Sequence, residues 1–441
     1  MHKFYGTAGL LLVAGAFWAG FATGDLRAAP RHHVPAASVA SPESPAVPPT
    51  QVYDEVLRAV RSRYVGPTGR VAVDNTRLTH AAIDGMLSAI GDRYTEYYTP
   101  KDYAAMLAEQ SGSFVGIGAT LDSTQDRRVV IARPLDGSPA QRAGLRTGDV
   151  VVAVDNKPVS GLAVETVIER IRGDENTFVR LTINRAGKPI QFLLRREMVQ
   201  SPVVEARMVD GKNKIGYISL TGFNEQADAQ FDAALKRLER AGMDALIFDL
   251  RDNPGGLLDE AQNIASRFLP DGPVVWVREK NGQMSSLDVD KAKHRGPLST
   301  GAYPVAVLVN EYSASASEIV AGAIQDGKAG VLVGKRTYGK GLVQTIIPLD
   351  DDSAVKITTQ HYFTRDKHDI NLHRDLNGTP DKGVGGIVPD FPVEMTDADA
   401  RRMHAAAITG NRDRDIAAED ALDLQLQKAL SVLRDRLDAH L

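Results

Sequence analysis

The spacing of hydrophobic positions changes along the chain. Apolar residues recur at helical intervals over 52–60, 78–90 and 101–110, which predicts a run of three helices. From residue 111 the sequence turns to short β-rich runs separated by glycines, with a single helical stretch over 164–171. This change of period predicts a helical unit that is followed by a separate β-rich domain.

A third pattern begins near residue 199, where apolar strands alternate with helices. The runs 245–250 and 305–309 are almost entirely apolar, as expected for strands whose two faces are both covered. Strands that alternate with helices are typical of an α/β layer structure. The tail that follows residue 395 is predicted to form two charged helices. The predicted fold class is therefore multidomain, with α/β and α+β parts.

An uncharged apolar run over residues 4–22 follows Lys3 and precedes all of these units. Its length approaches the roughly 20 residues that cross a bilayer. It exceeds the apolar region of about 7–15 residues that is usual in signal peptides. We therefore expect a signal anchor, or a cleaved signal peptide if Gly20-x-Ala22 is the processing site. Both interpretations place the rest of the chain outside the cytoplasm.

Six prolines lie between Pro30 and Pro49 among alanine, serine and valine, which predicts a semi-extended tether rather than a packed core. The length of 441 residues agrees with two or three folded units. The expected segments are the signal segment, the proline-rich linker, the helical unit, the β-rich domain, the α/β core and the helical tail, over residues 1–23, 24–50, 51–110, 111–198, 199–395 and 396–441.

Composition narrows the chemistry that this chain can perform. It has no cysteine, which excludes a thiol nucleophile, a disulfide framework and cysteine-ligated zinc. Its net charge is −4, so no basic field favours nucleic acid as a partner. We expect neither a cofactor nor a metal ion. His361, His368 and His373 lie near several aspartates and leave a histidine-based or metal site as an alternative, but the stretch is polar and contains no His-Glu-x-x-His motif.

Two turns of the α/β core carry candidate chemistry. The serine-rich segment 310–318 follows the apolar run 305–309 and precedes a helix, which would present a hydroxyl beside free N–H groups. The alternative is a helix cap, since the spacing of Ser315 and Glu318 fits a capping box. The second turn, Asp249 to Gly256, ends in two glycines that could offer N–H groups to an anion, or simply form a tight turn.

The third candidate segment places Lys340 between Gly339 and Gly341. It is not part of a phosphate-binding loop, because no Gly-x-x-x-x-Gly-Lys-Ser/Thr pattern is present. A solvated surface lysine is the simplest alternative. Three glycine- or serine-rich turns in one α/β unit nevertheless indicate a shared site, because turns at the carboxyl ends of parallel strands meet at one sheet edge.

Together these segments resemble the carboxyl-terminal processing proteases, a family of serine–lysine peptidases with an embedded PDZ domain. The resemblance spans nearly all of the chain from 52 to 393. The matching motifs are Ser-Ala-Ser-Ala-Ser-Glu over 313–318, Gly-Lys-Gly-x-x-Gln over 339–344 and Asp-Leu-Arg-x-Asn-Pro-Gly-Gly over 249–256. The family spacing of 25 residues between nucleophile and base selects Ser315, rather than Ser313 or Ser317, as the partner of Lys340. The resemblance also implies a crotonase-like layered core.

The resemblance implies roles for individual residues. Ser315 would attack the peptide carbonyl and Lys340 would accept the hydroxyl proton. Gln344 would lie on the same helical face or turn as Lys340 and orient it. The N–H of Ala316, with that of Gly255 or Gly256, would form the oxyanion hole. A lysine that acts as a base near neutral pH must be buried, because its ordinary pKa is about 10.4.

The β-rich domain resembles a PDZ domain. Its carboxylate-binding loop would be Val115-Gly116-Ile117-Gly118, and a substrate C-terminus would add as a strand beside 114–121. Arg172 resembles a family arginine that links PDZ occupancy to the active site.

The resemblance further implies protein substrates that are recognised by their C-termini, with an adaptor protein as a further candidate partner. The N-terminal segment would contact a membrane, so that the enzyme works on the periplasmic side of a bacterial inner membrane, anchored by residues 4–22 or soluble after cleavage. The tail helices would mediate homo-oligomers. The alternative function is a non-catalytic PDZ scaffold, which the presence of Ser315, Lys340 and Gln344 disfavours.

Overall fold

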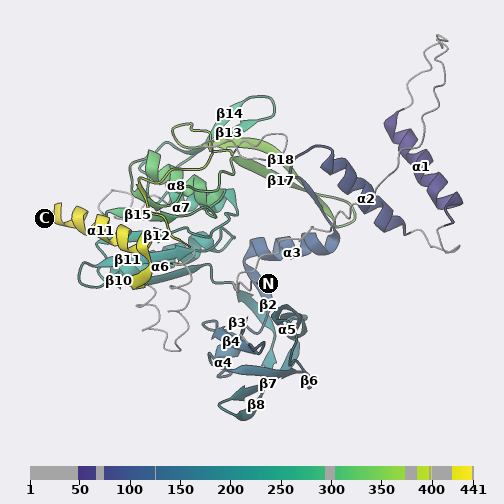
Figure 1. The fold of residues 1–441 in the computed structure, drawn as a ribbon, viewed down its shortest axis with the longest axis horizontal. Helices are drawn as coiled ribbons and strands as arrows, with labels where there is room; N and C mark the ends of the chain where they lie inside the picture. Colours follow the sequence, from purple (N-terminus) through teal and green to yellow (C-terminus); the bar gives the residue numbers. More distant parts are fainter. Residues whose placement is uncertain are drawn as a thin grey trace, which may run out of the picture. The chain divides into compact units, whose positions relative to one another are not determined.

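The computed structural model describes residues 48–65, 74–124, 126–293, 303–372, 385–396, 399 and 420–439 (Figure 1). The chain divides into one compact unit up to Met86 and a second from Leu87 onward. No helix of these described residues is long and apolar enough to cross a membrane. The segment 4–22, for which an anchor was predicted, lies outside them, so the membrane prediction has no support here.

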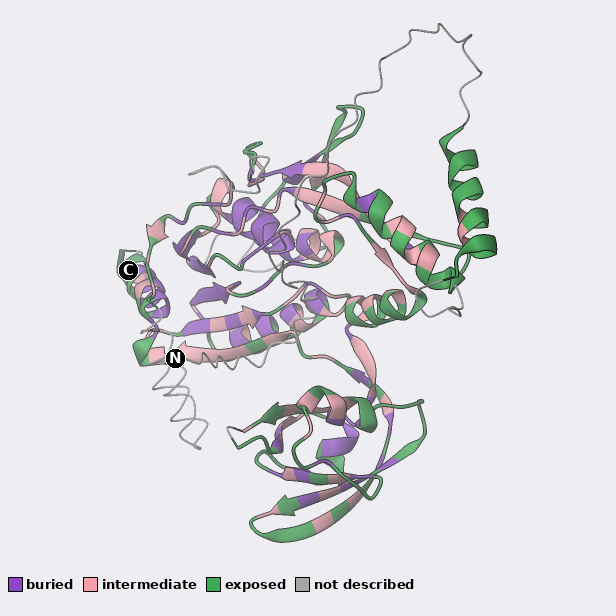
Figure 2. Ribbon diagram, turned by 45° about the vertical axis from the view of Figure 1, so that its right-hand side comes forward, coloured by how far each residue is buried: buried purple, intermediate pink, exposed green. Residues whose placement is uncertain are grey.

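The first unit is helical, as the apolar spacing predicts. Helix α1 (Pro49–Arg63) starts with a proline at its first position, where the missing N–H removes no helical hydrogen bond. None of its residues is buried (Figure 2). Helix α2 (Asn75–Ser88) follows and ends within the second unit, where Leu87 is buried.

The three predicted helices of 51–110 are present, but a strand that the sequence analysis did not predict interrupts them. Strand β1 (Glu96–Tyr98) separates α2 from helix α3 (Pro100–Ser111) and pairs antiparallel with strand β18 (Ala354–Phe363). A strand of three residues is too short to show a period in the sequence. Residues 87–111 therefore belong with the large unit rather than with α1.

The β-rich domain is built on an antiparallel sheet in the order β3-β4-β5-β7-β8, with β6 paired to β5. Its elements are β3 (Ala119–Ser123), β4 (Val129–Pro134), α4 (Pro139–Arg142), β5 (Val150–Val154), β6 (Lys157–Pro158), α5 (Val164–Ile171), β7 (Phe178–Arg185) and β8 (Lys188–Arg195). Among the described strands β3 lies at an edge, so on one side of its backbone no described strand is paired with it.

The strand predicted over 114–121 is divided in the structure. Its first part, β2 (Ser113–Gly116), pairs with β9 (Glu197–Gln200), and only the second part, β3, belongs to the domain's sheet. Gly118 lies between them with φ of +70°, and a Cβ there would lie 2.3 Å from the Cβ of Ser138. Glycine is therefore required at this bend.

The α/β core contains a sheet in the order β10-β11-β12-β15-β16-β19, antiparallel at β10 and parallel in the other pairs. The strands are β10 (Val204–Asp210), β11 (Ile215–Leu220), β12 (Ala245–Asp249), β15 (Val305–Val309), β16 (Val331–Gly334) and β19 (Phe391–Pro392). Every residue of β12 and β15 is buried, which confirms the prediction of strands covered on both faces.

Helices cover both faces of this sheet. One face packs on α6 (Ala227–Arg240), α7 (Leu258–Ala265) and α8 (Ala316–Asp326). The other face packs on the C-terminal helix α11 (Leu424–Ala439), drawn in yellow in Figure 1. The apolar face of α11 is thus part of the core, whereas its predicted role was self-assembly. The other predicted tail helix lies outside the described residues.

A second, antiparallel sheet packs against α8. Its order is β1-β18-β13-β14, with β17 also paired to β18. The remaining strands are β13 (Pro273–Glu279), β14 (Met284–Asp288) and β17 (Leu342–Pro348). Tyr362 of β18 is buried in the same hydrophobic cluster as α8. The layers therefore bring β17 and β18 next to the turn at which α8 begins.

The position of α11 predicts a clear contrast between two leucines of that helix. Leu430 is 4% exposed within the core cluster, whereas Leu424 is 46% exposed. Leu430→Ala should lower the free energy of unfolding by about 2–5 kcal/mol, because it leaves a cavity. Leu424→Ala should change it by about 0.5 kcal/mol or less. Urea unfolding followed by circular dichroism measures both, and equal effects would contradict the packing of α11 on the sheet.

Candidate active site

Ser315 lies where strand β15 gives way to helix α8, in a conformation that few non-glycine residues adopt. Its φ is 56° and its ψ is −115°, and α8 begins at the next residue, Ala316. Torsions of this kind cost of order 1–3 kcal/mol and persist only where the surroundings hold them. A strained strand-to-helix turn is also how α/β-hydrolases expose a nucleophilic serine above a sheet.

The helix-cap alternative for Ser315 is realised as a capping box with Glu318. The carboxylate of Glu318 accepts a hydrogen bond from the N–H of Ser315 (2.9 Å), as a capping box requires. The N–H of Glu318 faces Ser315 in return and donates to its main-chain oxygen (2.8 Å). A capping box uses the serine oxygen only as an acceptor, so it leaves the hydroxyl proton free for a base.

Glu318 also holds the lysine segment, which the sequence analysis did not foresee. It is fully buried, and one carboxylate oxygen accepts from the Thr337 hydroxyl (2.6 Å) and the Gly339 N–H (2.7 Å). The other accepts from the N–H of Lys340 (2.9 Å) as well as that of Ser315. Burial raises the pKa of Glu318, and these hydrogen bonds oppose that shift. One carboxylate thus joins the turns of Ser315 and Lys340.

The side chain of Lys340 reaches an aromatic neighbour. Its ammonium lies 4.9 Å from the centre of the Tyr94 ring, within cation–π range. Burial, together with the charge of Lys356, lowers the pKa of Lys340 to about 8 against the opposing effects of Glu318 and Glu96. No hydrogen bond between Lys340 Nζ and Ser315 Oγ occurs in the described structure.

The structure corrects the predicted placement of Gln344. This residue lies in strand β17, not on a helical face or turn shared with Lys340, and its side-chain amide donates to the Thr358 hydroxyl (3.2 Å). The run Leu342–Pro348 is rich in β-branched residues, which favour a strand. Among the described contacts, none joins the side chains of Gln344 and Lys340.

The glycine turn after β12 lies directly against the serine turn. A Cβ on Gly255, whose φ is +101°, would lie 2.7 Å from the oxygen of Ala314 and 2.9 Å from the nitrogen of Ala316. A Cβ on Gly256, at φ +146°, would lie 2.3 Å from the oxygen of Phe223. Only glycine fits at either position, which explains the paired glycines.

Asn253 fastens these two turns together and is a second residue that the sequence analysis missed. Its side chain is fully buried, donates to the Leu220 carbonyl (2.8 Å) and accepts from the Gly255 N–H (2.9 Å). Its own carbonyl accepts from the Ala314 N–H (3.0 Å) and the Ser317 hydroxyl (2.9 Å). The N–H of Gly255 is therefore already engaged.

Two N–H groups near Ser315 remain available. In the part of the chain that is described, no hydrogen bond engages the N–H of Gly256 or that of Ala316. Both belong to the turns that Asn253 fastens, and Ala316 opens helix α8, where the first N–H groups have no helical partner. Of the predicted oxyanion donors, these two are free to bind an anion.

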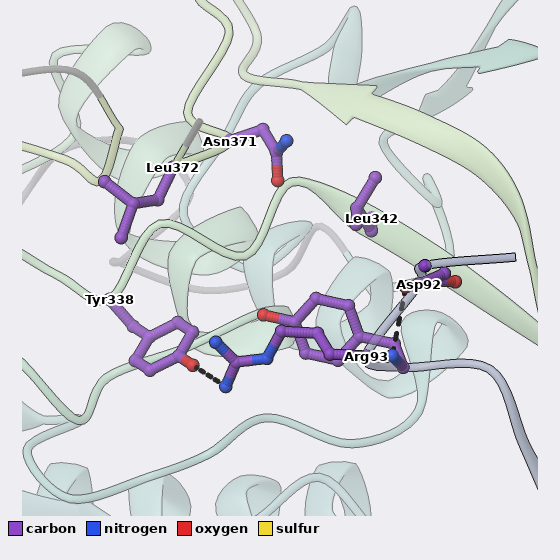
Figure 3. A pocket seen from close by; sticks show the side chains of 8 residues that line it. Asp92, Arg93, Tyr338, Leu342, Asn371 and Leu372 are labelled. Carbon is purple, nitrogen blue, oxygen red and sulfur yellow. Dashed lines mark hydrogen bonds between the residues drawn. The ribbon is translucent and has the colours of Figure 1, made fainter. Parts of the chain in front are cut away.

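A cavity of about 140 Å³ adjoins the lysine segment (Figure 3). Arg93 reaches across it and donates to the Tyr338 hydroxyl (2.7 Å). Because Tyr338 and Leu342 flank Lys340 in the sequence and Tyr94 contacts its ammonium, the cavity lies beside the candidate base. Its lining residues are Gly91, Asp92, Arg93, Tyr94, Tyr338, Leu342, Asn371 and Leu372.

The predicted carboxylate-binding loop is shorter in the structure than in the sequence analysis. Val115 and Gly116 belong to β2 and are paired with β9, so only Ile117 and Gly118 form a loop. Their carbonyls accept hydrogen bonds from the 135–140 segment, including the Ser138 hydroxyl on Gly118 (2.7 Å). No described hydrogen bond engages their N–H groups, which precede the edge strand β3.

The other predicted candidates do not reach this site. Arg172 is exposed after helix α5, and its side chain makes no described hydrogen bond or ion pair. His361 lies on β18, and His368 is 3.8 Å from Asp326. His373 lies outside the described residues, and no group of three potential metal ligands occurs within the ranges described above.

Family models match two parts of the chain. The model for peptidase family S41 matches residues 214–393, and a PDZ domain model matches residues 130–185. The S41 region contains all the turns around Ser315, and the PDZ match begins in β4 and ends with β7.

Relatives and a solved structure agree with these matches. A Synechocystis protein named carboxyl-terminal-processing protease is 35% identical over 76% of this chain and 75% of its own length. A Staphylococcus aureus (strain COL) protein named "Probable CtpA-like serine protease" is 36% identical over 68% of this chain, but the match spans only 59% of that protein. A Bacteroides fragilis structure assigned to the S41 proteases shares the fold, with a TM-score of 0.51, 16% identity and coverage of 89% of this chain and 99% of that one. The chain belongs to the carboxyl-terminal-processing protease family, within peptidase family S41.

Proposed function

We propose that this protein is a serine endopeptidase that uses Ser315 as nucleophile and Lys340 as general base. The observation that carries the proposal is the buried carboxylate of Glu318, which accepts hydrogen bonds from the N–H groups of both residues. The strained torsions of Ser315, at the turn where α8 begins, support the role of nucleophile. The lowered pKa of Lys340 supports the role of base.

The reaction proceeds in two steps. In the first, Ser315 Oγ bonds to the peptide carbonyl carbon while Lys340 Nζ takes the hydroxyl proton. Lys340 then gives that proton to the leaving amine, and the C–N bond breaks to leave an acyl-enzyme. In the second step Lys340 takes a proton from water, which attacks the ester carbonyl carbon. Lys340 then returns that proton to Ser315 Oγ as the ester C–O bond breaks and the new C-terminus is released.

The free N–H groups of Gly256 and Ala316 would stabilise the oxyanion that forms on the carbonyl oxygen. The neighbouring Gly255 would contribute by its backbone shape rather than as a donor, since Asn253 already engages its N–H. Gln344 is retained as the candidate that orients Lys340, acting from strand β17. This role requires Gln344 to leave its hydrogen bond to Thr358 or to share it.

Substrates would be proteins recognised by their free C-termini. The unpaired edge of β3 can accept a peptide strand, and helix α5 packs against the same strand. The N–H groups of Ile117 and Gly118 lie at the end of this edge, where they can receive a carboxylate. Support also comes from the name of the Synechocystis relative. Coupling through Arg172, an adaptor and a homo-oligomer remain predictions without a described contact.

The dyad predicts the behaviour of two single variants. Ser315→Ala and Lys340→Ala should each lower the kcat for cleavage of an unfolded protein by roughly 10³-fold or more, because nucleophile and base act as a unit. His361→Ala serves as the matched control on β18 and should retain the wild-type rate. Turnover of a fluorescent casein substrate measures all three. Equal turnover in wild type and Ser315→Ala would reject the proposal, as would loss of activity in the histidine variant alone.

The charges around Lys340 predict opposite shifts of the pH profile. Since the base must be neutral, kcat/KM should rise with pH and reach half its maximum near the Lys340 pKa of about 8. Lys356→Gln removes a cation that lowers this pKa, so the midpoint should move up by about 0.5 pH unit. Glu96→Gln removes an anion that raises it, so the midpoint should move down. Shifts of the two midpoints in the same direction would contradict the proposal that Lys340 is the base and that these two charges set its pKa.

The free edge of β3 predicts a dependence on the substrate C-terminus. Amidation removes the negative charge that the Ile117 and Gly118 N–H groups would bind, so it should raise KM by about tenfold or more while kcat changes little. The comparison uses one peptide with a free or an amidated C-terminus. Identical kinetics for the two peptides would remove the PDZ domain from substrate recognition and leave the dyad untouched.

A further inference from the structure

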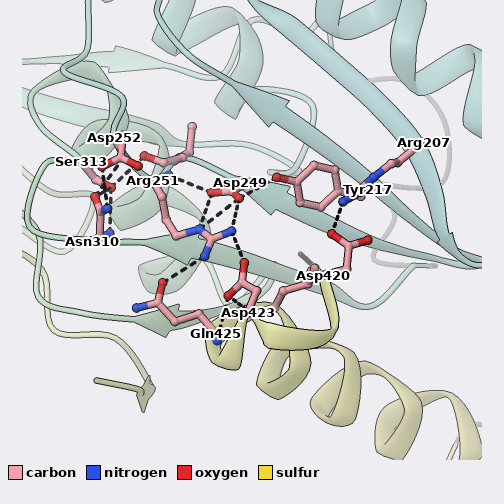
Figure 4. A network of polar contacts seen from close by, with 12 residues as sticks. Arg207, Tyr217, Asp249, Arg251, Asp252, Asn310, Ser313, Asp420, Asp423 and Gln425 are labelled. Carbon is pink, nitrogen blue, oxygen red and sulfur yellow. Dashed lines mark hydrogen bonds and ion pairs between the residues drawn. The ribbon is translucent and has the colours of Figure 1, made fainter. Parts of the chain in front are cut away.

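Arg251, in the turn that leads to the paired glycines, is a buried cation shared by two carboxylates (Figure 4). Its guanidinium contacts Asp249 at the end of β12 (2.6 Å) and Asp423, just before helix α11 (2.8 Å). All three side chains are at most 14% exposed. The guanidinium is the shared counter-ion of both acids, so its removal would leave two buried carboxylates without this partner, which is strongly unfavourable.

Asp423 has two functions at once, because its two oxygens face different ways. One oxygen accepts from the N–H groups of Gln425 and Leu426 (both 3.0 Å) and so caps the start of α11. The other contacts Arg251. Gln425 adds a contact, since its side-chain oxygen accepts from Arg251 (3.2 Å). The first turn of α11 is therefore built around the guanidinium.

A second chain of contacts converges on the same strand end. Asp420, three residues before Asp423, pairs with Arg207 on β10, and the Arg207 guanidinium lies 4.3 Å from the centre of the Tyr217 ring. The Tyr217 hydroxyl donates to Asp249 (2.7 Å). Contacts thus link both acids of the C-terminal segment to Asp249. Asp423 is linked through Arg251, and Asp420 through Arg207 and Tyr217.

Hydrogen bonds hold the backbone between Arg251 and the candidate oxyanion donors in place. The next residue, Asp252, has a φ of 59° and exchanges two hydrogen bonds with Asn310 (3.0 and 2.9 Å). Asn253 follows, with its buried bonds to the glycine and serine turns. A shift of Arg251 would therefore be transmitted to the N–H of Gly256.

We propose that the start of α11 is a positioning element of the active site, and that Asp423 sets the geometry of the oxyanion turn through Arg251. This inference rests on the proposed function. Apolar packing and the capping of α11 would stabilise the sheet, but neither requires a negative charge that faces Arg251. The two contributions separate in variants, because the ion pair and the apolar face use different residues of the helix.

Asp423→Asn isolates the ion pair, because asparagine keeps an oxygen to cap α11 and loses only the charge that faces Arg251. We expect kcat to fall by about tenfold with KM within about twofold, as for a change felt in the transition state. Asp423→Glu, which restores the charge, should recover part of this loss. Leu430→Ala is the matched control: it should destabilise the protein and keep kcat within about twofold at a temperature where it stays folded.

Amide hydrogen exchange tests the link between α11 and the turn without a measurement of catalysis. Amides of 249–257 should exchange faster in Asp423→Asn than in wild type, relative to the rest of the core sheet, and should keep their relative rates in Leu430→Ala. Unchanged kcat and unchanged exchange in Asp423→Asn would overturn the proposal, as would equal kcat losses in the asparagine and leucine variants. If wild type shows no Ser315-dependent cleavage, the proposed function fails, while hydrogen exchange still decides the link between α11 and the turn.

Discussion

A single buried carboxylate constrains the centre of this protein. Glu318 has no solvent with which to share its charge, so it must be satisfied by the four donors around it, which come from the serine turn and the lysine segment. Neither segment can move far without leaving a buried charge short of partners. The hydrogen bonds that this buried charge requires hold Ser315 in its strained backbone conformation.

The same carboxylate creates an electrostatic conflict for a lysine base. An anion near Lys340 favours the ammonium form, whereas the proposed chemistry needs the free amine. Burial and the neighbouring Lys356 outweigh Glu318, and Lys356 is itself held by Glu96 and the Tyr98 hydroxyl. The pKa of Lys340 thus depends on charged residues of strands β1 and β18 and of helix α8. The sequence around residue 340 does not reveal these opposing charges, because they come from distant segments.

The sequence predicts features that depend on neighbouring residues better than contacts between residues that are far apart in the chain. The buried strands β12 and β15, the serine turn and the paired glycines are visible because period and motif are local properties. Strand β1 is too short to show a pattern, and the spacing of Gln344 from Lys340 fits a shared helical face or turn as well as the strand that Gln344 occupies. Arg251 and Asp423 lie far apart in the chain, so no single-sequence pattern pairs them.

The packing of α11 has a consequence for the order of biosynthesis. A ribosome makes the strands, the serine turn and the lysine segment before residues 420–439 emerge. Until then one face of the parallel sheet is uncovered, and Arg251 has Asp249 but not Asp423 as counter-ion. The turn that carries the paired glycines therefore gains the contact with Asp423 only after the strands of the core have been synthesised.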